Sequence, residues 1–119
     1  MKEYLETLRE DKESLIESIA YYERMIKSSE ELVEITSNNI KWVNRIIKKR
    51  KELYAFEDNI DEIIAEDLKT RNCYYKNRSK YRKVLQEERE QLEIFKQALS
   101  ETMEEIQRVA QQINERGCN

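Results

Sequence analysis

The sequence predicts an all-α protein built as an elongated antiparallel three-helix bundle. The chain of 119 residues contains no proline and a single glycine, Gly117, so little in it interrupts a helix. Apolar residues recur at steps of three, four or seven along most of the chain, which is the spacing of one helix face. Charged residues make up 39% of the chain, a share that suits thin bundles with much surface per residue.

The first helix is expected at residues 2–35. Its apolar line is interrupted by Lys12 and Ser29 at core-like positions. The line consists of Met1, Leu5, Leu8, Leu15, Ile19, Tyr22, Ile26 and Val33. The next residues, 36–39, read Thr-Ser-Asn-Asn, and such side chains compete with the helical backbone for hydrogen bonds. We therefore expect the first turn there.

The second and third helices are expected at residues 40–69 and 79–115. Between them, residues 70–79 are the poorest helix formers of the chain and predict the second turn. Asp58-Asn59 indicates a kink or cap within the second helix. The expected core of the second helix is Ile40, Val43, Ile46, Ile47, Leu53, Phe56, Ile60, Ile63, Ile64 and Leu68. That of the third is Tyr81, Leu85, Leu92, Phe95, Leu99, Ile106, Val109 and Ile113, with Glu88 and Thr102 as polar members.

The alternative fold is a long two-helix hairpin that turns near Asp58-Asn59, for which pairing of two copies as a dimeric coiled coil is one option. Charge blocks bear on this choice. Residues 41–51 hold six bases and no acid, residues 52–68 seven acids and no base, and residues 69–83 seven bases and no acid. A reversal near residue 59 would set the bases of 41–51 beside those of 69–77, which is unfavourable. The charge pattern therefore favours three helices.

Length and composition predict one helical domain, residues 1–119, in the cytoplasm. The longest apolar runs are only a few residues, too short for a membrane span. The first residues lack the basic and apolar segments of a signal peptide. Cys73 and Cys118 are too few for a disulfide framework, which is consistent with a reducing compartment.

Residue types argue against an enzyme. The chain contains no histidine, the commonest acid–base group and metal ligand. One glycine cannot form a phosphate-binding loop. Cys73 lies near Arg71 and Lys76 but is expected to be an unreactive thiol. We therefore expect no catalytic residues, no cofactor and no metal.

Apolar residues outside the main lines predict a protein–protein interaction module. Trp42 is the only tryptophan, and an exposed tryptophan is typical of an interface anchor. We expect a non-enzymatic adaptor, chaperone-like or inhibitory partner that binds another protein, and a homodimer would cover the same side chains. The candidate partner-binding residues are Tyr21, Met25, Leu32, Ile35, Trp42 and Tyr54.

Nucleic-acid binding is the less favoured alternative. Segment 69–83 mixes bases with tyrosines that could stack on unpaired nucleobases, but the chain as a whole is acidic, with a net charge of −3. The candidate contacts are Arg71, Tyr74, Tyr75, Lys76, Arg78 and Lys80.

A third alternative is a small helical secretion partner or a structural coiled-coil component. Tyr54 and Asp58 have the Tyr-x-x-x-Asp spacing that small helical secretion partners can carry. The Trp-x-Gly turn of those proteins is absent, because this chain has Trp42-Val43-Asn44. The sequence therefore assigns no family.

Overall fold

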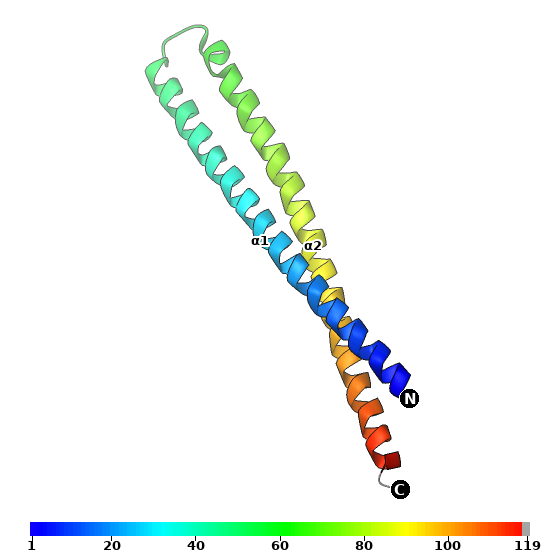
Figure 1. Cartoon of the computed structure of the whole chain (residues 1–119). Helices are drawn as coiled ribbons and strands as arrows, with labels where there is room; N and C mark the ends of the chain where they lie inside the picture. The colour runs from blue at the N-terminus through cyan, green and yellow to red at the C-terminus, as the bar shows by residue number, and fades with distance from the viewer. Residues whose placement is uncertain (118–119) are drawn as a thin grey trace. The chain divides into compact units, whose positions relative to one another are not determined.

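The computed structural model describes residues 1–117, which form two long α-helices and no strand. Helix α1 runs over Lys2–Leu53 and helix α2 over Ile60–Gly117, joined by a short turn (Figure 1). Because proline is absent and Gly117 stands at the end of α2, no residue type within either helix forces it to break. The all-α prediction is confirmed.

The prediction of three helices was wrong. Both expected turns, residues 36–39 and 70–79, lie inside continuous helices, so the ranges 2–35, 40–69 and 79–115 do not stand. The Thr36 hydroxyl donates to the carbonyl of Leu32, one helical turn earlier, at 2.7 Å, so its polar group is satisfied without leaving the helix. Packing against the other helix overrides the low helix propensity of residues 70–79. The alternative of a two-helix hairpin is confirmed.

The turn occupies residues 54–59. The Tyr54 amide still donates to the carbonyl of Arg50 and continues the bonding pattern of α1. Asn59 then stands just before α2, and its carbonyl accepts hydrogen bonds from the amides of Glu62 and Ile63. Asp61 and Glu62 lie in the first turn of α2, where negative charge favours the helix dipole. The sequence signal at Asp58-Asn59 therefore marks a helix start rather than a kink.

The chain divides into two compact units. We call residues 1–26 with 87–117 the terminal unit, and residues 27–86 the turn unit. The terminal unit has an apolar cluster in which Leu5 and Leu8 of α1 meet Val109 of α2, with Ile106 and Ile113 packed against them. Val109 is 0% exposed. Further along this unit, the ring of Tyr22 lies 5.4 Å from that of Phe95, centre to centre.

In the turn unit, the most buried side chains of α1 follow one another at steps of three and four. Such a heptad line keeps one seam of a helix against its neighbour. The line consists of Ser29, Val33, Thr36, Ile40, Val43 and Ile47, and Ile64 and Leu85 are buried on α2. Ser29 is buried, as its core-like position predicted. In the terminal unit the polar seam members Lys12, Glu88 and Thr102 are likewise buried or half-buried.

Polar contacts fix the register of the turn unit. An Arg50 Nη atom lies 3.2 Å from the Asp67 carboxylate and 3.5 Å from the carbonyl of Ile63. Nearer the middle of the unit, Arg71 donates to the Asn44 side chain at 3.1 Å. Near the turn Arg50 thus meets an acid, and deeper in the unit Arg71 meets the uncharged Asn44. The charge argument against the hairpin was therefore wrong, because these contacts pair a base with an acid or an amide rather than with a second base.

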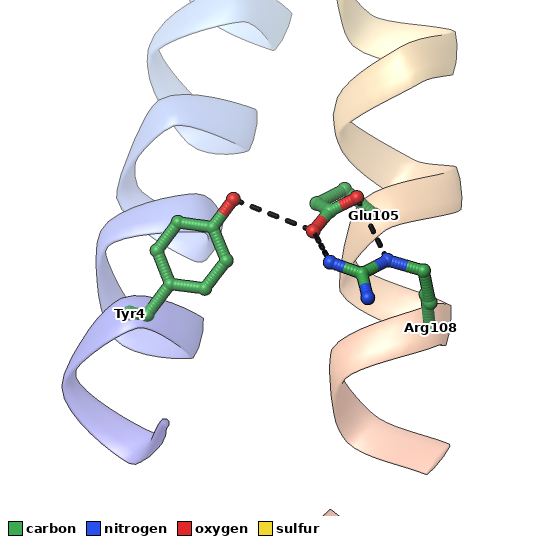
Figure 2. A network of polar contacts seen from close by, with 3 residues as sticks. All are labelled: Tyr4, Glu105 and Arg108. Carbon is green, nitrogen blue, oxygen red and sulfur yellow. Dashed lines mark hydrogen bonds and ion pairs between the residues drawn. The ribbon is translucent and has the colours of Figure 1, made fainter. Parts of the chain in front are cut away.

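A polar network joins the two helices in the terminal unit. Figure 2 shows the Tyr4 hydroxyl of α1 directed at the Glu105 carboxylate of α2, at 3.4 Å. On the other side of that carboxylate, Arg108 donates from Nε at 3.1 Å and from an Nη atom. Hydrogen bonding to Arg108, more than its charge, holds the pKa of Glu105 below its usual value, and Tyr4 adds to this effect while burial opposes it.

Truncation of Val109 tests the core of the terminal unit. Val109→Ala should lower the free energy of unfolding by about 1–3 kcal/mol, because it removes buried apolar volume and leaves a cavity. Urea denaturation followed by circular dichroism measures the change. The matched control is Val84→Ala on the same helix at a 41% exposed position, where the loss should be under about 0.5 kcal/mol. Equal losses at the two sites would contradict this packing.

Removal of Arg108 tests the polar network. Arg108→Gln should raise the pKa of Glu105 toward its ordinary value, as seen in an NMR titration of the side-chain carboxyl carbon. Because the folded pKa lies below the unfolded one, the contact stabilises above the unfolded pKa and is lost as pH falls through the folded pKa. Arg116→Gln, near the end of α2, should leave the Glu105 titration unchanged. An unshifted midpoint in Arg108→Gln would refute the assigned contact.

Candidate partner-binding surface on α1

A second heptad line runs along α1 in the turn unit, beside the buried one. Its members follow one another at alternating steps of three and four residues, as the buried line does. We call it the outer stripe, and it consists of Leu32, Ile35, Asn39, Trp42, Ile46, Lys49 and Leu53. Most of its apolar members are exposed, and Ile46 and Asn39 are half-buried. Helix α1 thus has two seams, of which α2 covers one.

Trp42 stands in the middle of the outer stripe and is 57% exposed. It lies at the edge of a shallow hollow of about 430 Å³. We call this part of α1 the basic face, lined by Trp42, Arg45, Ile46, Lys48, Lys49 and Glu52. An exposed indole ringed by cations offers both an apolar anchor and a charged rim.

The two sides of the helix pair in the turn unit differ in charge. In the register set by Arg50 and Asp67, the α2 positions that flank the pair on the outer-stripe side are all uncharged. They are Ile63, Thr70, Asn77 and Val84. The opposite side has Glu30 and Lys51 on α1 and Asp61 and Arg82 on α2. On the outer-stripe side, the α1 and α2 positions next to the seam therefore carry no charged residue. The basic residues near Trp42 lie further from the groove between the helices.

The turn unit is also basic as a whole. It contains 14 Lys and Arg residues against 10 Asp and Glu, a net charge of +4. The terminal unit contains 8 against 15, a net charge of −7. The outer stripe therefore lies in the positive part of an acidic protein, which favours partners that carry acidic side chains.

The six predicted partner-binding residues are spread over three places. Leu32, Ile35 and Trp42 belong to the outer stripe. Tyr21 is exposed and Met25 half-buried at the equivalent helix positions of the terminal unit. Tyr54 is exposed at the start of the turn. The structure thus collects half of the set on one surface, and their binding role stays a prediction.

Sequence reasoning placed in the core three apolar residues that are exposed or half-buried near this surface. Ile46, Leu53 and Phe56 were expected in the core, but Ile46 is only half-buried and the other two are largely exposed. All three continue the steps of three and four that begin at Leu32. That second line was the signal that would have found them.

The residues proposed for nucleic-acid contact are largely used within the turn unit. Arg71 bonds to Asn44, and the guanidinium groups of Arg71 and Arg78 lie 5.9 and 5.3 Å from the centre of the Tyr75 ring. These cation–π contacts occupy the aromatic surface that would stack on a nucleobase. Tyr74 is half-buried, whereas Lys76 and Lys80 are exposed.

Reactive groups are few in the described chain. Cys73 is an exposed free thiol, and Cys118 lies outside the described residues. Over residues 1–117, no group of three or more Cys, Asp and Glu side chains is placed to hold a metal ion. Neither α1 nor α2, as described to residue 117, contains a stretch apolar enough to cross a membrane.

Comparison with known proteins finds no matching family model, no matching characterised protein and no matching solved structure.

The exposure of Trp42 can be tested by fluorescence. Because Trp42 is the only tryptophan, the emission of the chain reports this position alone. In dilute solution we expect an emission maximum close to that of free tryptophan and strong quenching by acrylamide. N-acetyltryptophanamide gives the fully accessible reference, and the urea-unfolded chain gives a second. Blue-shifted emission with little quenching in dilute solution would contradict the exposed indole.

Proposed function

We propose that this protein is a non-enzymatic helical interaction module, which binds an α-helix of another protein along the outer stripe. It would act in the cytoplasm as an adaptor, a chaperone-like protein or an inhibitory partner. The observation that carries the proposal is Trp42, exposed at the centre of an otherwise unpartnered heptad line. Large aromatic anchors surrounded by a polar rim provide most of the energy of many interfaces.

The form of the stripe supports a helix as the bound element. Its apolar residues recur over several turns of α1, so a second helix lying along it could contact all of them. Leu32 on α1 and Val84 on α2 flank the same groove in the turn unit, and both are exposed. A helix there would cover α1 chiefly and the edge of α2.

The polar members of the stripe support a specific partner rather than general stickiness. Asn39 and Lys49 stand at heptad positions that would face the bound helix. A polar residue in such a seam lowers affinity but selects the register in which it finds a partner group. The basic residues beside Trp42 further favour a helix with acidic flanks.

The test is capture of a partner followed by mapping. The full chain is used to isolate a protein from native extract, the captured protein is purified, and direct binding is measured by calorimetry. Trp42→Ala should weaken binding by about 30-fold or more, since loss of an interface anchor costs about 2 kcal/mol. Ile16→Ala is the matched control, because Ile16 is exposed on α1 of the terminal unit, away from the stripe. Equal affinity of the wild-type chain and Trp42→Ala would refute the proposal.

A further inference from the structure

We infer that a second copy of this chain binds the outer stripe, through an acidic face of α2 in its terminal unit. The inference goes beyond the proposed function, because it names a second copy of the chain rather than another protein as an occupant of the same surface. The contact joins the turn unit of one molecule to the terminal unit of another. Three observations support it: a second exposed apolar residue within an acidic rim, matching spacing on the two faces, and opposite net charge of the two units.

The acidic face is a hollow of about 530 Å³ on α2. Its lining residues are Glu93, Ile94, Gln97, Ala98 and Glu101. Ile94 is 60% exposed, more than the other exposed apolar side chains of α2, which are Tyr75, Val84 and Met103. The Gln97 amide donates to the Glu101 carboxylate at 3.1 Å, which holds that carboxylate at the rim. An exposed isoleucine beside two glutamates is the counterpart of an exposed tryptophan beside cations.

The two faces have matching chemistry along their length. On the basic face Lys49 follows Trp42 by two helical turns, and on the acidic face Glu101 follows Ile94 by the same interval. If the two helices run parallel, Lys49 lies near Glu101 when Trp42 lies near Ile94. If they run antiparallel, the same spacing places Trp42 near Ser100 when Lys49 lies near Glu93. The parallel direction is therefore the one that sets an apolar contact beside an ion pair.

Net charge selects unlike units over like ones. Two turn units repel each other at +4 each, and two terminal units repel each other more strongly at −7 each. A turn unit and a terminal unit of different molecules attract each other, and their fields increase the rate of encounter. The second copy therefore approaches with its acidic unit toward the outer stripe.

Each molecule has one face of each kind, so two molecules can pair reciprocally. The basic face of the first would bind the acidic face of the second, and the converse contact would form at the same time. Where both contacts form between the same two molecules, the assembly closes at two copies. The second contact forms within one complex at high effective concentration, so two weak contacts can give a stable dimer.

A charge-swap experiment on the full-length chain tests the inference by sedimentation equilibrium at low salt. The wild-type chain should show a mass that rises to that of a dimer with concentration, and added salt should weaken this association. Arg45→Glu/Lys49→Glu changes the basic face alone, and Glu93→Lys/Glu101→Lys changes the acidic face alone. Each double variant by itself should dimerise about tenfold or more weakly, because like charges now meet.

The most decisive measurement is the mass of an equimolar mixture of the two double variants. Both contacts regain opposite charges, so the mixture should recover the dimer that each variant alone forms only weakly. Lys2→Glu/Lys27→Glu is the control for the basic-face variant, since it makes the same change in net charge away from both faces and should dimerise as the wild type does. Circular dichroism of every variant verifies that the helices are formed. Acrylamide quenching of Trp42 should also fall as the wild-type concentration rises.

Three outcomes would overturn the inference. The first is a wild-type chain that stays monomeric up to about 100 μM, far above the micromolar range of specific association. The others are an equimolar mixture that stays monomeric, and a control variant that dimerises as weakly as the face variants do. None of them bears on the proposed function, which is tested with a different protein and the Trp42→Ala variant. Conversely, a purified partner that binds Trp42→Ala unchanged would refute the proposed function and leave the sedimentation result standing.

Discussion

The structure depends on one constraint: each helix has a single other helix to pack against. Within each unit a heptad seam of α1 faces α2, and apolar residues such as Val43 and Val109 are almost wholly buried there. One seam buries only a narrow strip of the helix surface. A second apolar line on the same helix therefore stays exposed. The outer stripe of α1 is the direct result. The candidate binding surface therefore follows from the number of helices.

The same constraint explains how polar residues come to lie in the seam. Thr36 is buried, and its hydroxyl bonds to the carbonyl of Leu32 within the same helix. At the end of α1, Arg50 reaches Asp67 and the Ile63 carbonyl across the pair. The Thr36 hydroxyl finds its partner within its own helix, so it lies in the seam without an unsatisfied group. The Arg50 contacts cross the pair and favour one register, while the apolar seam supplies most of the stability.

Much of the seam could be predicted from sequence, and the number of helices could not. The lines that include Leu5, Ile26 and Val109 were expected to be core and are buried. The error came from local signals: residues 36–39 are typical of turns, yet α1 continues through them. Charge patterning misled for a related reason, because it treated each basic block as uniform, whereas Arg50 meets Asp67 and Arg71 meets the uncharged Asn44. Surface pairs contribute only about 0–1 kcal/mol each, too little to set a topology against a continuous seam.

The outer stripe was within reach of the sequence as a second heptad line, but its exposure was not. Leu53 and Phe56 look like core residues until the chain is known to end its first helix beside them. Asn39 and Lys49 are then polar residues within an apolar line that is exposed to water in the free chain. A wholly apolar line would promote non-specific association, whereas two polar members keep the free surface hydrated and penalise partners in the wrong register. The stripe thus has the composition expected of a surface that is exposed in one state and covered in another.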